Sequence, residues 1–594
     1  MARPGAPLAP RVALLAACVL ASASLAASAP ASPPPAAADD AAARKAAFHA
    51  GTDGTSFLEV SAITACIPLG VLARLALDAY EGVRVEPRGG LLVSRDGRPL
   101  RPSRVYLRDF ILCVLPALPA MLAPAIAIPA CAVTSLSFAL FARRAVDRRA
   151  PTRVSIFGET LAPETHLPLG PPDRLGASRP FLTAYRATMT FTTAIAILAV
   201  DFPAFARRLG KCEAHGVSLM DVGAGSFVFA SGVVSRRARF GGEGVFGEGE
   251  SGDAMAAVRR TVRSVAPTAL LAAIRTAATR ATAYHVPVGE YGVDWNFFAT
   301  LAAVALLADA APVPRGRARS GAFSALAGAI VLLAHQLALA APGGPELGRR
   351  FVLAEGERRM DSFVDRNREG LGSVPGYLGV YFLGAAAGAA TERMVVAAYR
   401  RGGSTRAVKK KEEGKNKNTK SGKAGAVSSD EADERAAERE REHPPDASVF
   451  VSAPRRFVLW ASLASLAAWA LTLAAHTLVE PVCRRSANLA YAAWIVAHNL
   501  TCVAAFAACA AAFPEAPPAP KLLQAANRVL LPTFLVANAS TGACNLAMET
   551  NEASAAAAWG LTGAHALAVA AFAAVAGAKE GAGDERRKGV EKME

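Results

Sequence analysis

The chain has 594 residues, of which 52% are hydrophobic and 19% are charged, and its formal net charge is +16. With a mean hydropathy of +0.27, this composition excludes a purely soluble enzyme. The positive charge would suit either a nucleic acid or an anionic membrane surface, so its position along the chain must decide between them.

The first 29 residues have the layout of a secretory signal peptide. Arg3 and Arg11 precede an apolar run over residues 12–20, and small residues follow as far as Ala29. A transit peptide is the alternative, because Ser and Ala are frequent and no acidic residue precedes Asp39, although transit peptides are usually richer in Arg. Residues 30–56 are predicted to form a lumenal spacer.

Thirteen apolar stretches follow that are long enough, or nearly so, to cross a membrane as helices of about 20 residues. We therefore predict an all-α fold, a polytopic membrane protein with about 13 transmembrane helices. The predicted spans are residues 57–78, 108–124, 126–143, 182–201, 218–235, 262–281, 294–311, 321–341, 375–398, 456–478, 487–513, 526–548 and 556–577. Helices 1–9, with lumenal active-site loops, thus occupy residues 57–398, and helices 10–13 occupy residues 456–577.

The basic residues indicate how the chain crosses the membrane. Short cytosolic loops retain Lys and Arg, and a lumenal amino terminus places most of the positive charge on the cytosolic side, including the tail at residues 578–594. Residues 399–455 are rich in Lys, Glu and Ser and are predicted to be a disordered basic cytosolic linker. The net charge therefore reflects membrane topology, and no nucleic acid partner is expected.

The nine cysteines indicate neither a disulfide framework nor a metal site. Most lie in apolar stretches, and no CxxC pair is present, so no metal is expected. Cys212 and Cys483 lie in polar connections and could pair in an oxidising lumen, but free thiols are the favoured prediction.

Charged residues near the membrane are the strongest candidates for function, because a charge inside a bilayer is costly. The densest group begins where an apolar span ends at Asp201, continues through Arg207, Arg208, Lys211 and Glu213, and re-enters the membrane at Asp221. An ordinary lumenal loop with solvated charges is the alternative. Asp201 and Lys211 are ten residues apart, about 15 Å along a continuous helix, so only a folded-back loop would bring them together.

Three weaker polar groups lie farther along the chain. They contain Glu290 with Asn296, Asn488 with Asn499, and Asn538 with Asn545. In the last two groups, amide side chains within a span are more often helix-packing contacts than ligands. The isolated histidines within spans are potential buried bases, but packing is the favoured interpretation for them: His335, His476, His498 and His565.

Taken together, these groups resemble the inositol acyltransferase family of GPI-anchor biosynthesis, called GPI-anchored wall transfer protein in fungi and PIG-W in animals. The resemblance covers residues 46–577. It rests on Ala199–Pro203, Arg207, Arg208, Lys211, Leu219–Phe229, Glu290–Val293, Trp295–Phe298, Gly376–Leu378, Arg485, Ala487–Leu489, Asn538, Thr541, Gly542 and Asn545. Asp294 stands where the family usually has a histidine, and His498 stands where an aromatic residue is expected.

The resemblance implies a multi-pass enzyme of the endoplasmic reticulum membrane that transfers a fatty acyl group from acyl-CoA to the inositol ring of glucosaminyl-phosphatidylinositol. Membrane lipid, acyl-CoA and glucosaminyl-phosphatidylinositol are then the partners, with acyl-CoA as co-substrate and no bound cofactor. The family's catalytic carboxylate and lysine correspond to Asp201 and Lys211. The predicted substrate-binding residues are Arg207, Arg208, Glu213, Asp221, Glu290, Asn296, Asn488, Asn499 and Asn545.

Acyl transfer to an alcohol requires a base for the hydroxyl and a positive group for the developing oxyanion, roles that Asp201 and Lys211 would fill. A non-enzymatic lipid or solute transporter is the alternative, since polar groups within many spans suit it equally. The sequence shows no inverted pairs of interrupted spans, which disfavours a transporter.

Overall fold

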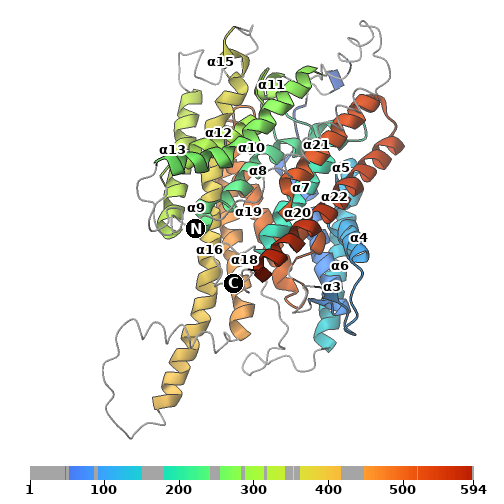
Figure 1. Cartoon of the computed structure of the whole chain (residues 1–594), viewed down its shortest axis with the longest axis vertical. Helices are drawn as coiled ribbons and strands as arrows, with labels where there is room; N and C mark the ends of the chain where they lie inside the picture. Colours follow the sequence, from blue (N-terminus) through green and yellow to red (C-terminus); the bar gives the residue numbers. More distant parts are fainter. Residues whose placement is uncertain are drawn as a thin grey trace.

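A computed structural model describes residues 44, 47–48, 52–85, 91–149, 179–240, 254–281, 288–312, 317–340, 352, 361–415, 447–517 and 519–590. The long helices of this part of the chain run side by side as a bundle, and α16 extends beyond the others (Figure 1). A two-stranded antiparallel hairpin, β1 (Arg84–Val85) and β2 (Leu92–Val93), is the sheet that these residues contain. The predicted signal peptide and most of the predicted spacer lie outside the described residues.

Helices of very different lengths follow one another along the chain. The part up to residue 340 contains α3 (Phe57–Glu81), α4 (Pro102–Cys113), α5 (Ala117–Leu122), α6 (Pro124–Arg149), α7 (Pro180–Ala199), α8 (Leu219–Val233), α9 (Arg236–Phe240), α10 (Ala254–Ala281), α11 (Val288–Tyr291), α12 (Phe297–Ala310) and α13 (Arg317–Ala340). The part after residue 340 contains α15 (Phe363–Arg366), α16 (Arg368–Lys415), α18 (Ala447–Ala474), α19 (Leu489–Ala512), α20 (Lys521–Arg528), α21 (Leu530–Ala547) and α22 (Ala555–Val590).

Each of the thirteen predicted spans overlaps a helix of the structure. Within the described ranges, eight helices are long and apolar enough to cross a membrane, and a ninth span results if α20 and α21, which are bent by 89° at their break, count as one. The all-α membrane architecture is therefore confirmed, whereas the count of about 13 spans is not. Helices α8 and α12 are apolar but have only 15 and 14 residues, and α10 is interrupted by arginines.

The segment predicted as a cytosolic linker, residues 399–455, has helices at both of its ends. Helix α16 continues to Lys415, and α18 begins at Ala447. Residues 416–446, between these helices, lie outside the described part of the chain.

Helices α3, α7 and α19 form the centre of the bundle. Between 61% and 72% of their apolar segments is buried, against 17% for α6 and 22% for α18. The difference places α6 and α18 at the periphery. In a membrane protein the lipid tails, and not only other side chains, can cover such an apolar helix face.

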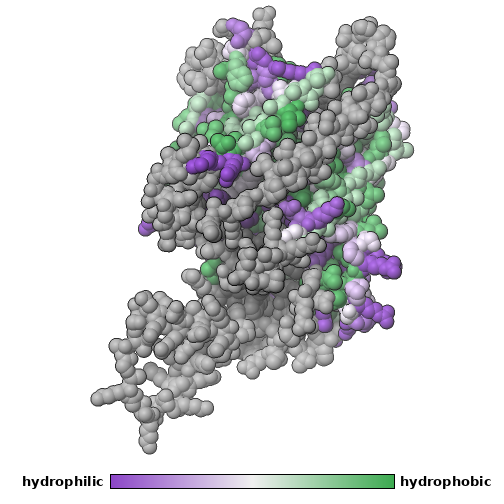
Figure 2. All heavy atoms as spheres, in the orientation of Figure 1, coloured by the Kyte–Doolittle hydropathy of each residue, from purple (hydrophilic) through white to green (hydrophobic). Residues whose placement is uncertain are grey.

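Figure 2 shows hydrophobic residues along one edge of the molecule, above a group of hydrophilic residues. Large exposed apolar side chains on α4 and α6 include Leu107, Ile111, Leu136 and Leu140. Exposed apolar surface of this extent would be unusual in a water-soluble monomer. Contact between these side chains and lipid tails accounts for such a surface.

Glycines allow α8 and α16 to approach closely. A Cβ atom added at Gly232 would overlap the carbonyl oxygen of Tyr381, and one added at Gly384 would overlap the carbonyl oxygen of Phe229. Small residues at such contacts are a common device of membrane helix packing, because they bring backbones within van der Waals distance. The contact fixes α8, which carries Asp221, against the rest of the bundle.

Serine residues cap the starts of α3 and α8. Ser56 accepts a hydrogen bond from the Glu59 backbone amide at the start of α3, and Ser218 accepts one from the Asp221 amide at the start of α8. Such N-caps satisfy backbone donors that the first helical turn leaves unpaired. The caps therefore fix where α3 and α8 begin, and α8 follows the loop that carries the predicted site.

Candidate functional site

Asp201 follows the last turn of α7 and is only 9% exposed. Its Oδ2 atom accepts a hydrogen bond of 2.6 Å from the amide of Asn545, which lies near the end of α21. The Oδ1 atom of Asn545 in turn accepts a hydrogen bond of 2.8 Å from the Thr550 hydroxyl. The structure thus brings together two of the predicted site residues, Asp201 and Asn545, which are 344 positions apart in the chain.

Arg207 lies in the same loop as Asp201. Its guanidinium donates hydrogen bonds to the carbonyl oxygens of Val200 (2.6 Å) and Phe48 (3.3 Å), and it lies 4.1 Å from the centre of the Phe48 ring. Burial lowers the pKa of Arg207, and the negative charge of Asp201 opposes this shift. The loop is therefore folded back so that a cation lies near the Asp201 carboxylate.

Lys211 pairs with Glu290, with 2.5 Å between Nζ and Oε1. The Lys211 side chain is 41% exposed, whereas that of Glu290 is 19% exposed. Burial would raise the pKa of Glu290, but Lys211 and Arg484 outweigh it and lower this pKa below its ordinary value. In the described part of the chain the predicted catalytic pair thus has separate neighbours, Asn545 for Asp201 and Glu290 for Lys211.

Asp221 and Arg484 form a buried ion pair beneath this loop. Their Oδ1 and Nε atoms are 2.7 Å apart, and the two side chains are 0% and 4% exposed. Asp221 Oδ2 also accepts hydrogen bonds from the Ser218 hydroxyl (2.8 Å) and the Cys212 amide (3.2 Å). The pair therefore fastens the Asp201–Lys211 loop to the segment that precedes α19. With its oxygens occupied in this way, Asp221 has the contacts of a structural residue.

We expect Asp221→Asn to destabilise the protein by about 3–5 kcal/mol, because it leaves the Arg484 guanidinium buried without its counter-charge. The measurement is the melting temperature of the detergent-solubilised protein. Asp147→Asn is the matched control, since it breaks an ion pair with Arg143 in which the acid is 49% exposed, and exposed pairs contribute only about 0–1 kcal/mol. Equal shifts for the two variants would contradict the role of Asp221.

The other predicted basic and acidic residues of the loop have ordinary partners. Arg208 forms a two-pronged ion pair with Glu59 (2.7 Å between Nη2 and Oε1; 3.0 Å between Nε and Oε2), and its side chain is 51% exposed. Glu213 accepts a hydrogen bond of 2.8 Å from Arg485 through its backbone carbonyl. Cys212 and Cys483, the two thiols considered for pairing, are both buried and free.

Two of the predicted asparagines begin helices. Asn296 accepts hydrogen bonds from the amides of Phe298 and Ala299 at the start of α12. Asn488 accepts a hydrogen bond of 3.0 Å from the Tyr491 amide at the start of α19. These are the contacts of N-caps, which explains polar residues at these positions without a ligand.

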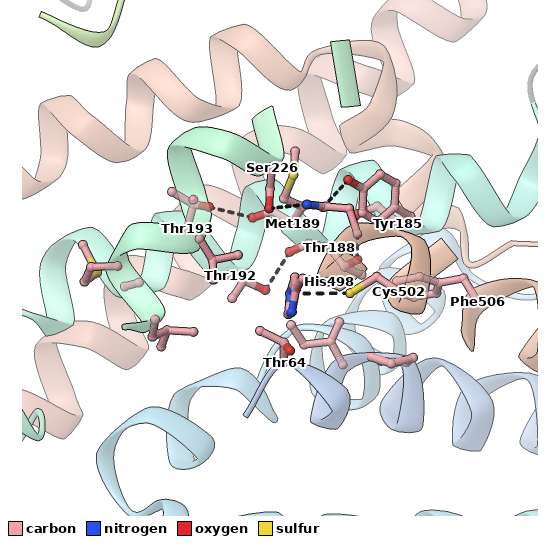
Figure 3. A pocket seen from close by; sticks show the side chains of 18 residues that line it. Thr64, Tyr185, Thr188, Met189, Thr192, Thr193, Ser226, His498, Cys502 and Phe506 are labelled. Atoms are coloured by element: carbon pink, nitrogen blue, oxygen red, sulfur yellow. Dashed lines mark hydrogen bonds between the residues drawn. The ribbon is translucent and has the colours of Figure 1, made fainter. Parts of the chain in front are cut away.

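Asn499 lies deeper, in the wall of a cavity between α3, α7, α8 and α19 (Figure 3). It accepts a hydrogen bond of 2.5 Å from the Tyr185 hydroxyl and donates one of 3.0 Å to Ser226. Figure 3 shows Tyr185, Cys502 and Phe506 on one side of the cavity and Thr193 on the other. The lining residues are Thr64, Ile67, Pro68, Tyr185, Thr188, Met189, Thr192, Thr193, Ala196, Leu219, Met220, Val222, Gly223, Ser226, His498, Asn499, Cys502 and Phe506.

The cavity is more apolar than its composition indicates. The hydroxyls of Thr188, Thr192 and Thr193 each donate to a carbonyl oxygen four residues earlier in α7, at 2.7–2.9 Å. The Thr64 hydroxyl does the same in α3, at 3.0 Å. Since these hydroxyls are satisfied within their own helices, the threonines can offer their methyl groups to a ligand. The chemistry of the cavity therefore suits a hydrocarbon chain.

Sequence reasoning missed Arg484 as the partner of Asp221, Thr550 as the partner of Asn545, and the cavity itself. A buried charge requires a partner, so Asp221 alone indicated that some cation would be near it. For the cavity, the signal was the repetition of threonine at positions 188, 192 and 193 in an otherwise apolar span.

Comparisons with known proteins agree on one family. A family model described as GWT1 matches residues 41–576. An uncharacterized protein from Arabidopsis thaliana, At4g17910, is 32% identical over 63% of this chain and 68% of its own length. The GPI-anchored wall transfer protein 1 of Cryptococcus neoformans is 32% identical over 62% of this chain and 57% of its own length, and that of Eremothecium gossypii is 32% identical over 64% and 71%.

Proposed function

The chain belongs to the GWT1 family, and on that premise we propose that it is an acyl-CoA-dependent acyltransferase that acylates the inositol ring of glucosaminyl-phosphatidylinositol. The names of the fungal relatives support a role in GPI-anchor biosynthesis. The proposed location is the membrane of the endoplasmic reticulum, which about thirteen helices would cross.

The Asp201 carboxylate carries this proposal. It is nearly buried, it is held by Asn545 at 2.6 Å, and it stands at the end of α7, the helix that lines the apolar cavity from Tyr185 to Ala196. A carboxylate fixed in this way beside a place for a fatty acyl chain is the arrangement that acyl transfer to an alcohol needs, since a base must lie within reach of the attacking hydroxyl.

In the proposed reaction the acyl chain occupies the cavity, and its thioester lies near Asp201. The inositol oxygen attacks the thioester carbonyl while Asp201 accepts the hydroxyl proton. Because the free alcohol is a very weak acid, proton removal and attack must be concerted. The new oxygen–carbon bond replaces the carbon–sulfur bond, and the proton passes to the departing sulfur, so the products are acylated inositol and free CoA thiol.

Lys211 is proposed to stabilise the negative charge that develops on the carbonyl oxygen. It is exposed enough to meet a ligand, and its pairing with Glu290 limits the directions in which its ammonium group points. A preorganised cation in a partly dry site contributes more to such stabilisation than it would in water. Arg207 is the second cation of the loop, and its place near Asp201 fits it to bind a phosphate of either substrate.

Membranes that contain this chain as the sole candidate enzyme test the proposal against a lipid or solute transporter. They are supplied with labelled acyl-CoA and glucosaminyl-phosphatidylinositol, and the lipids are analysed by mass spectrometry. We expect a product that carries the acyl label on the inositol ring. Movement of either substrate across the membrane without any acylated product would replace the enzyme with the transporter.

A further inference from the structure

The cavity between α3, α7, α8 and α19 has one end near the proposed site and one end far from it. Ala196, which lines the near end, is five residues before Asp201, and Met220 lies in the first turn of α8 just after the Asp201–Lys211 loop. At the far end the lining residues are Tyr185 on α7 and Phe506 on α19. A ligand that enters beside Asp201 therefore extends along α7 toward these two rings.

Tyr185 and Phe506 close the far end. Their ring centres are 6.5 Å apart, and the residues are 2% and 4% exposed. The hydrogen bond from the Tyr185 hydroxyl to Asn499 holds the tyrosine ring in place. Beyond it on α7, Phe181 is buried at 1% exposure and does not line the cavity. The far end is therefore a wall of packed aromatic rings.

The spacing of the lining residues along α7 is comparable to the length of a long fatty acyl chain. Ala196 and Tyr185 are eleven residues apart on α7, about 16 Å along the helix. An extended chain advances roughly 1.2 Å per bond, so about 13 bonds fit between the two positions. Because the walls are mainly apolar and the two packed rings stand at the far end, a chain that is too long must displace a ring to place its last carbons there.

We propose that Phe506, packed against Tyr185, is the stop that sets the longest acyl chain this protein transfers. The inference rests on the proposed acyltransferase function and adds to it a determinant of acyl-chain specificity. Cys502 lies one turn before Phe506 on α19 and also lines the cavity. The two positions thus provide opposite tests. A smaller residue at 506 would lengthen the cavity, and a larger residue at 502 would shorten it.

The experiment measures kcat/KM in membranes for a series of saturated acyl-CoAs that differ by two carbons. For Phe506→Ala, we expect the ratio of the next longer chain to the wild-type optimum to rise at least about tenfold, the discrimination that a methylene supplies in an apolar pocket. For Cys502→Leu, which fills the channel, we expect a similar shift toward shorter chains. Phe457→Ala is the matched control, because Phe457 is buried at 1% exposure but does not line the cavity.

Cys502→Leu keeps the inference testable if Phe506→Ala does not fold. It adds side-chain volume to the cavity, whereas Phe506→Ala removes side-chain volume. Unchanged chain preference in an active Phe506→Ala or Cys502→Leu protein, or the same shift in Phe457→Ala, would overturn the inference while leaving the acyltransferase function intact. If the wild-type protein forms no acylated inositol at all, the proposed function fails instead.

Discussion

Replacing Asp201 by asparagine is expected to lower the rate of inositol acylation by about 10²–10⁴-fold, the usual contribution of a general base. Asparagine has nearly the same shape and can still accept the hydrogen bond from Asn545, but it cannot take up the hydroxyl proton. The measurement is kcat for acyl transfer in membranes, normalised to the amount of folded protein. Substrate binding should change little, since the neighbouring cations remain.

Asp309→Asn is the matched control for this variant. Asp309 is an exposed acid on α12 that accepts a hydrogen bond of 2.9 Å from Ser264, and it lies outside the proposed site. We expect the activity of the Asp309→Asn variant to equal that of the wild type. If Asp201→Asn also kept activity within a few-fold of the wild type, Asp201 would not be the base.

Replacing Lys211 by methionine is expected to lower kcat by about 10²–10³-fold, the effect of removing one oxyanion-stabilising group. Methionine keeps an unbranched side chain but removes the ammonium group, and it leaves Glu290 without its partner. Because burial then acts on Glu290 with less opposition, the pKa of that carboxyl should rise. The measurement is kcat with saturating acyl-CoA as a function of pH.

One further variant of Lys211 and one control at another lysine show whether the positive charge of Lys211 matters. Lys211→Arg keeps the positive charge and should recover part of the lost activity. Lys579→Met removes an exposed lysine on α22 and should behave like the wild type. Full activity in Lys211→Met would show that the oxyanion is stabilised elsewhere in the loop.

Helix positions follow from hydropathy with good accuracy, because a membrane-crossing helix has a clear length and composition. The number of spans does not follow from the same signal. Helices α8 and α12 are short, and the bend of 89° between α20 and α21 depends on packing that hydropathy does not describe. Length and apolar composition identify a helix, but they do not determine whether it crosses the bilayer by itself.

The residues of the candidate site are easier to predict than their partners. The motifs predict Asp201, Lys211 and Asn545 as site residues, but they do not predict the 2.6 Å contact that joins Asp201 to Asn545 across 344 residues. Likewise, the sequence predicts Asn296 and Asn488 as ligands, whereas their contacts are those of helix caps. Polar residues near apolar spans can either bind a ligand or cap a helix. Only the folded structure shows which asparagine side chain accepts hydrogen bonds from the backbone amides at the start of a helix.

The claim that this chain transfers an acyl group to inositol through Asp201 can be tested with purified protein in lipid nanodiscs. Release of free CoA thiol and formation of acylated inositol are measured together, for the wild type and for Asp201→Asn. We predict that the wild type forms the two products in equal amounts and that Asp201→Asn loses both together. Thiol release without acylated inositol, or equal product formation by the two proteins, would contradict the claim.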